Sequence, residues 1–484
     1  MINACVTASL GRPVRQATLC IAAIFATLLF SGCVTAFDTN RKELESLHAE
    51  GRYDIAAQIL DDPKVKEEYG QKNVLLYWLD RGSIALALRD PAGTVNWLDR
   101  ADNYMEVKRE PTAGDEFARW LINDTITPYY GSSYEELYAN VFKLLAQLEL
   151  GNINGGATVE ARRMAGKADV LRDRYIRTRD AVAKQGDAGV QAALTPAGGS
   201  GYVDVNVGGQ FIDSSLGDFL TAIAFMKDGD RENQRVAGKR MASSISLQAN
   251  TQRDVNPGPL SGVGELEARD VNVLVVGLSG RGPTKIARTI GPIPLYQWPL
   301  YMQLPVLQGG SEEVASARIM VQDAGAANLS PGGVPLFKIE DMRMVAEENF
   351  RRELPLIYAR TILRSSIKAA AAYAATQAVK NQAHGDTKIA AQLGMIVAGL
   401  AFEALTEKAD LRSWVFLPAR ADAGLLKLPP GRHLLRVEYL SGGGWPLYAG
   451  PWHEVNIPAA DGGGGAGAGG EDKQIVTVVE HFWR

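Results

Sequence analysis

Three cationic side chains share one face of a predicted helix in the second half of the chain. Arg360, Arg364 and Lys368 recur at four-residue spacing, which brings side chains together on one helix face. Such a row of cations could bind an anionic glycan or a partner that carries carboxylates. More often such a row forms an intramolecular charge network, here with Asp410 and Glu403 as acceptors. The spacing therefore predicts a helix face that contacts anions. These anions belong either to a ligand or partner or to this chain itself.

A second charged pair, Asp410 and Arg412, lies in the segment ADLRSWVFLP that spans residues 409–418. A carboxylate beside a guanidinium could be an active-site pair. More often such a pair orders a loop while a neighbouring aromatic side chain fills the core. We expect the structural role for Asp410, Arg412, Trp414 and Pro418, and we assign no catalytic residue.

The remaining residue types limit metal, phosphate and nucleic-acid chemistry. The five histidines show no ligand spacing such as HExxH, so no metal site is expected. The Gly-rich turn GLSGRGP at residues 277–283 lacks the Lys-Ser/Thr pair of a phosphate-binding loop. The formal net charge of -4 gives no global attraction to nucleic acid. We therefore expect no cofactor and no nucleic-acid partner.

The amino-terminal segment is typical of an export signal that ends at a cysteine. Arg12 and Arg15 precede the uncharged apolar run 17–30, which is too short for a comfortable bilayer crossing. The next residues complete LFSGC at 29–33, which resembles a bacterial lipobox. That resemblance implies cleavage before Cys33 and acyl chains, including palmitate, on its thiol. The alternatives are a plain secretory signal and an N-terminal membrane anchor.

The residue after the cysteine bears on the membrane that the chain reaches. In enteric-type bacteria an Asp there tends to retain lipoproteins at the inner membrane, and Val34 stands in its place. The resemblance therefore implies the outer membrane, with the protein on its periplasmic face. Stable anchoring needs more than one acyl chain. We expect residues 1–32 to form the signal peptide and residues 33–40 a lipidated tether.

Residues 41–250 are predicted to form pairs of helices. One pair has the spacing of the tetratricopeptide repeat, carried by Trp78, Gly82, Ala85, Thr94, Leu98 and Ala101. Small residues at such positions let neighbouring helices pack closely. The pattern predicts a degenerate tetratricopeptide-like domain whose concave surface holds a protein segment, with a generic helical bundle as the alternative. The predicted helices are 42–50, 54–60, 75–88, 92–104, 134–150, 157–173, 216–227 and 232–244.

Residues 256–484 are predicted to form a mixed α+β domain with a β-sandwich-like portion. A long helix is expected over residues 339–382, interrupted at Pro355, and a buried helix over residues 386–408. A β-hairpin is expected over residues 425–439, around the turn Pro429-Pro430-Gly431. The other predicted strands are 271–278, 284–290, 301–307, 317–321 and 473–479.

Three motifs in this chain resemble a known family. The segment 409–418 resembles an AD-x-RSW-xx-LP signature, and residues 359–368 resemble an AR-xx-LR-xxx-K helix. Residues 134–136 and 159–163 resemble the third helical hairpin of the same family. Its members are uncharacterised proteobacterial lipoproteins with a tetratricopeptide-like amino-terminal half. The resemblance implies no catalytic residues. Relatives are sometimes encoded near lipoprotein activators of peptidoglycan synthases, which makes peptidoglycan synthesis an expected context.

Two functions from different classes follow from these patterns. The first is a non-enzymatic envelope lipoprotein that binds a partner protein as a scaffold or accessory factor. The second is a cell-wall hydrolase or transferase whose carboxylates lie far apart in the sequence and meet in the fold. A cleft with two carboxylates about 5–9 Å apart would favour the enzyme.

Overall fold

A computed structural model describes residues 36–109, 127–184, 211–247, 254–295, 298–323, 332–358, 361, 408–458 and 474–483. The expected signal peptide, Cys33 and the cations Arg360, Arg364 and Lys368 lie outside these residues, as does the predicted helix 386–408. The chain divides into two compact units, residues 1–44 and residues 45–484. The domain boundary that the sequence predicts between residues 250 and 256 stays a prediction. None of the described helices is long and apolar enough to cross a bilayer.

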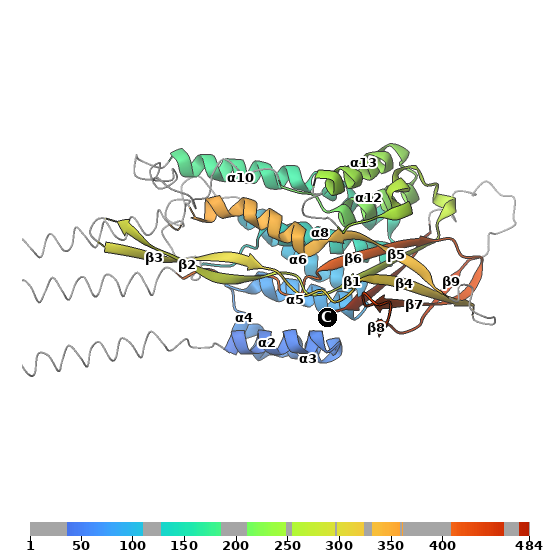
Figure 1. Ribbon diagram of the computed structural model, residues 1–484, viewed down its shortest axis with the longest axis horizontal. Coiled ribbons are helices and arrows are strands. Elements are labelled where there is room, and N and C mark those ends of the chain that lie inside the picture. The colour runs from blue at the N-terminus through green and yellow to red at the C-terminus, as the bar shows by residue number, and fades with distance from the viewer. Residues whose placement is uncertain are drawn as a thin grey trace, which may run out of the picture. The chain divides into compact units, whose positions relative to one another are not determined.

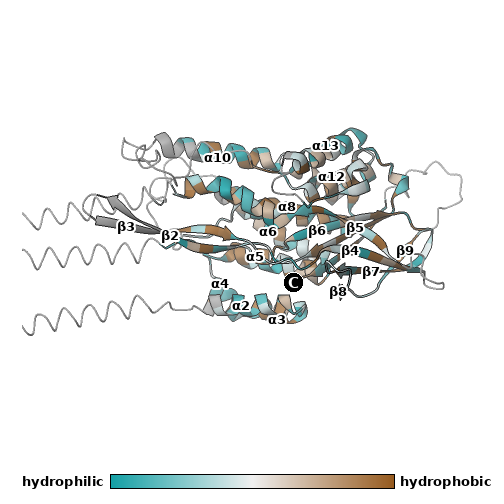
Figure 2. Ribbon diagram, viewed as in Figure 1, coloured by the Kyte–Doolittle hydropathy of each residue, from teal (hydrophilic) through white to brown (hydrophobic). Residues whose placement is uncertain are grey.

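The fold of the second unit is α+β, with helices in the first half and strands in the second (Figure 1). Figure 2 shows alternating hydrophilic and hydrophobic stretches along α10, where Leu171 and Tyr175 are buried while Asp173 is exposed. An unlabelled helix spans 342–358. The other described helices are α2 (Ala36–Ala49), α3 (Tyr53–Asp61), α4 (Pro63–Tyr69), α5 (Val74–Ala87), α6 (Pro91–Arg109), α8 (Ser133–Glu149), the π-helical turn η1 (Ile153–Ala157), α9 (Thr158–Met164), α10 (Lys167–Lys184), α12 (Ser215–Asp228), α13 (Arg231–Leu247), and the 3-10 helices η3 (Gly258–Glu265) and η4 (Ala268–Asp270).

Local sequence signals explain where two of the longer helices begin and end. Ser132 and Glu135 form a capping box at the start of α8, which satisfies backbone donors of its first turn. Ser214 caps α12 by accepting a hydrogen bond from the backbone N–H of Gly217. At the other end of α12, Gly229 adopts a left-handed conformation, with φ of 91°, that ends the helix.

Helices α5 and α6 pack closely where the sequence places a glycine. A Cβ atom at Gly82 would lie 2.5 Å from Cδ2 of Leu98. Such a separation is far below a normal carbon–carbon contact, so only glycine fits without a shift of Leu98. Both helices therefore approach as the small-residue spacing predicts. The contact does not by itself identify a tetratricopeptide repeat.

Several predicted helix boundaries were wrong. Helix α2 begins at Ala36, within the segment 33–40 that was expected to be a tether. The predicted helix 157–173 is two helices, α9 and α10, which meet at Ala165 and Gly166. The short helix α4 was not predicted, although Asp62 caps it and Pro63 opens it.

The strands form one eight-stranded sheet and a separate two-stranded ribbon. The order in the sheet is β10-β1-β6-β5-β4-β7-β8, and β9 also pairs with β7. All pairs are antiparallel except β1 with β10, which is parallel. The strands are β1 (Val273–Ser279), β2 (Thr284–Leu295), β3 (Trp298–Gln308), β4 (Ser316–Asp323), β5 (Val334–Asp341), β6 (Arg420–Leu426), β7 (Gly431–Leu440), β8 (Pro446–Ala449), β9 (His453–Ile457) and β10 (Val476–Phe482).

The sheet curls, so that strands distant in its order share one core. The hydroxyl of Tyr439 on β7 donates to the carbonyl oxygens of Leu278 on β1 and Glu480 on β10, at 3.2 and 2.8 Å. Val275 of β1 and Val437 of β7 lie in the same buried cluster. The sandwich-like packing therefore arises from one curled sheet rather than from two separate ones.

Two predictions for this half were wrong. Residues 339–341 belong to strand β5, so the following helix begins at Met342, and within 342–358 it continues through Pro355 without a break. The predicted hairpin over residues 425–439 does not form, because β6 pairs with β1 and β5 while β7 pairs with β4, β8 and β9. The segment Pro429-Pro430-Gly431 is therefore a crossover between strands that are not neighbours.

Candidate functional site

A cluster of buried charges lies where α6, α8, α9 and α10 meet. The ammonium of Lys143 on α8 is fully buried. Its Nζ lies 2.8 Å from Oδ2 of Asp102, 2.8 Å from Oδ1 of Asp99 and 3.2 Å from Oε2 of Glu160. The side-chain amide of Asn140 also donates to Glu160, at 2.5 Å. A lysine surrounded in this way is held in place and has lost its contact with water.

A second buried ammonium, that of Lys167 on α10, extends the cluster. Its Nζ lies 3.1 Å from Oε1 of Glu136 and 3.4 Å from Oδ1 of Asp102. Arg174 donates to the other oxygen of Glu136, at 2.5 Å. The carboxylate of Asp102 thus lies between the two lysines and joins both halves of the cluster.

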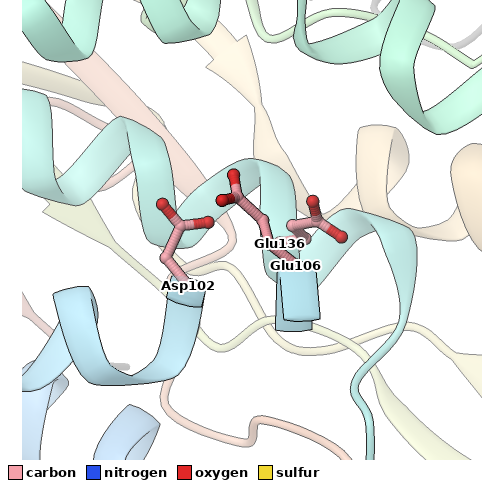
Figure 3. Close-up of side chains that lie close together, drawn as sticks. All are labelled: Asp102, Glu106 and Glu136. Carbon is pink, nitrogen blue, oxygen red and sulfur yellow. The ribbon is translucent and has the colours of Figure 1, made fainter. Parts of the chain in front are cut away.

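Three carboxylates of this cluster have the arrangement of a cation site. Oxygen atoms of Asp102, Glu106 and Glu136 lie within 4.8 Å of one another, and Figure 3 shows the three groups facing a common space. Carboxylate oxygens are ligands for hard divalent cations. Lys167 Nζ, however, is within 3.8 Å of all three residues. The ammonium takes the place that a metal ion would occupy, so we assign no metal here.

Burial and ion pairing act in opposite directions on the pKa values of this cluster. Burial alone would lower the pKa of Lys143, but Asp102 and Glu160 raise it above its ordinary value. The pKa of Lys167 is raised in the same way by Glu136 and Asp102. Burial raises the pKa of Glu160 despite the nearby ammonium of Lys143. Both lysines therefore stay charged at neutral pH, and neither has the lowered pKa of a catalytic base.

The carboxylate of Glu135 connects the helices to the segment 409–418. Its Oε1 accepts the backbone N–H of Trp414 at 2.6 Å, and its Oε2 accepts the Tyr129 hydroxyl at 2.6 Å. The Trp414 ring is fully buried, and its Nε1 donates to Oγ of Ser83 on α5 at 2.8 Å. Glu135 and Trp414 thus fasten α5 and α8 to the strand-rich half.

Asp410 and Arg412 pair with each other and hold a loop. The guanidinium of Arg412 donates to both carboxylate oxygens of Asp410, at 2.8 Å each. It also donates to the carbonyl oxygens of Lys72 and Thr127, at 3.3 and 3.1 Å. Pro418 is buried at the end of the same segment. These contacts bind the segment to loops beside α5 and α8 rather than to an open cleft.

A pair of acidic side chains near the start of α12 is the arrangement closest to an acid–base site. Asp213 and Asp218 both contact the guanidinium of Arg240, and Nε of Arg240 lies 3.3 Å from Oδ1 of Asp218. Burial raises the pKa of both carboxyls, although Arg240 opposes the shift. Asp218 is only 1% exposed. The side chain of Asp213 is 17% exposed, so solvent reaches the pair from the Asp213 side only.

Glu340, at the end of β5, is fully buried beside the same helix start. It accepts hydrogen bonds from the hydroxyls of Tyr138 and Ser214 and from the backbone N–H of Leu216, each at 2.5 Å. Burial raises its pKa, and these hydrogen bonds oppose the rise. The carboxylate lies at the positive end of the α12 dipole and joins α8, α12 and β5.

A polar recess of about 370 Å³ lies at the end of α2. Oppositely charged side chains, Arg281 and Glu313, line it together with Glu50 and Trp483. The indole of Trp483 packs edge-on against the ring of His48, with centroids 4.1 Å apart. Burial lowers the pKa of His48 well below its ordinary value, and His481 lowers it further. His48 is therefore neutral and belongs to an aromatic cluster rather than to a metal site.

The buried charges of α8 were not singled out from the sequence. Glu136 and Lys143 read as ordinary polar positions of a surface helix, but α8 is buried on every side. The available signal was the capping box followed by Asn140 and Lys143 in an otherwise apolar segment. Their partners come from α6, α9 and α10, which no local pattern reveals.

No protein-family model, curated protein or solved structure matches this chain.

Proposed function

We propose that this chain is an acylated lipoprotein of the bacterial outer membrane, facing the periplasm, that binds a partner protein as a scaffold or accessory factor. Its expected context is peptidoglycan synthesis. The main support for the proposal is the attachment of α5 and α8 to the strand-rich half. It is made by the hydrogen bonds of Trp414 to Glu135 on α8 and to Ser83 on α5. Helices fixed in this way present a surface of constant shape, which suits binding without a large loss of entropy.

The tetratricopeptide-like surface of the α5–α6 pair carries a suitable contact residue. The indole of Trp97 on α6 is half-buried between two guanidinium groups, with Arg81 and Arg100 at 4.8 and 4.7 Å from the ring centroid. Trp and Arg are enriched among the residues that contribute most to protein–protein affinity. Trp97 and Arg100 are therefore our candidates for partner contact, together with Arg360, Arg364 and Lys368.

Photo-crosslinking in living cells tests partner binding. A crosslinking amino acid at Asn96 or Arg100, both exposed on α6, should give one defined adduct. The same amino acid at Lys64, exposed on α4, is the matched control and should give none. Trp97→Ala should abolish the adduct while the chain stays folded. Equal adducts from all three positions, or an adduct that Trp97→Ala leaves unchanged, would count against the scaffold.

The lipid anchor is tested at Cys33. Metabolic labelling with a palmitate analogue should tag the chain and fail to tag Cys33→Ser. The variant should also leave the membrane fraction in part, since its acyl chains are missing. Labelling that persists in Cys33→Ser would place the modification elsewhere and overturn this part of the proposal.

A cell-wall hydrolase or transferase is the second candidate, favoured by Asp213 and Asp218. A raised carboxyl pKa is what a general acid requires near neutral pH. If the pair is catalytic, overproduced chain should release soluble fragments from purified peptidoglycan, and Asp213→Asn should stop the release. Absence of release by the folded chain would exclude this activity on that substrate.

A further inference from the structure

The β2–β3 ribbon leaves the sheet and extends away from it (Figure 1). Its strands are 12 and 11 residues long and pair only with each other among the described strands. An isolated two-stranded ribbon is marginally stable in water. A ribbon of this length therefore needs a further contact along its outer part.

The sequence of the ribbon is unlike that of a water-exposed hairpin. No residue between Arg288 and Glu312 is charged. The outer parts of the strands, residues 290–295 and 298–302, read IGPIPL and WPLYM. Trp and Tyr together with aliphatic residues are the composition that favours the interface between water and lipid.

Both charged residues of the ribbon strands are positive. Lys285 and Arg288 are the only charged residues of β2, and β3 has none. Arg288 is exposed. Bacterial membranes carry anionic phospholipids, whose headgroups attract Lys and Arg near the surface. Arg288 therefore stands where headgroups would lie if the outer part of the ribbon entered a bilayer.

Proline positions argue against pairing with a strand of another molecule. Pro294 lies opposite Pro299, and Pro305 lies opposite Ala287. Because proline has no N–H to donate, both must be non-hydrogen-bonded pairs of the antiparallel ribbon. In such pairs the backbone N–H and C=O groups point away from the other strand of the ribbon, toward its outer edges. The outer edges of both strands therefore lack donors at these positions, and an added strand would lose hydrogen bonds there. A second copy of the ribbon is thus a poor occupant.

The base of the ribbon is fixed to the folded unit, so the outer part is held in a defined direction. Leu304 and Pro305 are buried. The ammonium of Lys285 donates to the Tyr129 hydroxyl at 3.3 Å, and it lies 5.3 Å from the centre of the Phe350 ring. Tyr129 itself donates to Glu135. The ribbon is therefore connected to the same junction that joins the helices to the sheet.

We propose that the outer part of the β2–β3 ribbon inserts into the headgroup region of a phospholipid bilayer. Residues 290–295 and 298–302 enter the boundary between headgroups and acyl chains, and Arg288 stays at the anionic surface. Amphipathic helices at such an interface bury their apolar face to a depth of about 5–10 Å, and we expect a similar depth for the ribbon. The contact goes beyond the proposed function, because it needs neither the acyl group nor a protein partner.

The test places an environment-sensitive fluorescent amino acid at Leu300 of the full chain. The matched control carries it at Ala287, which is exposed near the base of the same ribbon. Each protein is reconstituted with vesicles of phosphatidylethanolamine and phosphatidylglycerol, with and without a lipid that bears a nitroxide on its acyl chain. Both proteins carry the same proposed acyl anchor at Cys33. A difference in quenching between the two probes therefore reports on the ribbon alone.

We expect the nitroxide lipid to quench the probe at position 300 and to leave position 287 unchanged. Quenching at 300 should persist in Cys33→Ser, which separates this contact from the acyl anchor, and should disappear in Trp298→Asp. If iodide in the aqueous phase quenches the probe at position 300 equally with and without vesicles, the proposal is overturned. If protection of this probe from iodide rises with protein concentration in the absence of lipid, the ribbon binds a second copy of the chain and the proposal is overturned.

Discussion

The carboxylate of Glu135 accepts a hydrogen bond from the backbone N–H of Trp414 at 2.6 Å, although 279 residues separate them in the chain. Glu135 belongs to the first turn of α8 and Trp414 to the segment that leads into β6. One buried carboxylate thus serves both as a helix cap and as the attachment point of the strand-rich half. Its removal should affect both roles at once.

Replacement of Glu135 by alanine should lower the free energy of unfolding by about 3 kcal/mol, because buried donors of Tyr129, Ser132 and Trp414 lose their acceptor. Glu135→Gln keeps one acceptor oxygen and should cost less. Urea denaturation followed by tryptophan fluorescence measures both. Glu67→Ala, exposed on α4, is the control. A loss no greater than that of the control would show that the junction contributes little.

Replacement of Lys143 by methionine should cost about 3–5 kcal/mol, because Asp102 and Glu160 would remain buried without their main cation. The further change Glu160→Gln should recover part of the loss, since it removes one of the unpaired charges. Lys64→Met on exposed α4 is the control. Denaturant unfolding of Lys143→Met, Glu160→Gln, the double variant and the control measures these losses. Additive losses in the Lys143 and Glu160 double variant would contradict a coupled cluster.

Substitution of Gly82 by alanine should destabilise the chain by about 1–3 kcal/mol, because the new methyl group would meet Leu98. In a Leu98→Ala background the same substitution should cost less, since the obstructing side chain is gone. Gly166→Ala meets no atom within 4 Å and serves as control. Thermal unfolding of the four-member cycle measures the coupling between the positions. Equal costs in both backgrounds would show that the close packing of α5 and α6 is not the cause.

Stability should depend on pH through Glu149. Burial raises the pKa of this carboxyl from 4.5 to about 7 in the folded chain, although Arg89 opposes the shift. Between those values the folded chain holds a proton that the unfolded chain has released. The free energy of unfolding therefore falls as the pH rises through this window and becomes constant above it.

Glu149→Gln cannot titrate and should lack this dependence. Relative to the parent chain, the variant should gain stability as the pH rises from 4.5 to about 7. Below the window the difference should reach a constant value. Urea midpoints measured across this range give the comparison. A difference that does not change with pH would mean that Glu149 titrates alike in the folded and unfolded chains.

The helices of the first half could be predicted because each depends mainly on its own residues. The apolar periodicity of α5, α8 and α12, with Ser132 or Ser214 before the first turn, is a local property. The close approach at Gly82 was also visible as a small residue at the right spacing. The periodicity of the sequence does not identify the partner of a buried charge. Lys143 meets Asp102 across 41 residues, and only the packing of the helices brings them together.

The strand half was harder because pairing is not local. Residues 339–341 fit a helical pattern as well as an extended one, and their pairing with β6 decides for the strand. The turn Pro429-Pro430-Gly431 suits a hairpin, yet the partners of β6 come from residues 273–279 and 334–341. The interpretation of Asp410 and Arg412 as a loop-ordering pair used local spacing, whereas the attachment of Arg412 to Lys72 and Thr127 could not be foreseen.

The parallel pairing of β1 with β10 sets the time at which this protein can finish folding. Residues 273–279 pair with β6 on one side, but on the other side they pair with residues 476–482, which are synthesised much later. A ribosome must therefore have synthesised residues 476–482 before the sheet is complete, and contacts between such distant segments form slowly. During that interval the edge of β1 that later pairs with β10 has unpaired backbone groups and is open to chaperones.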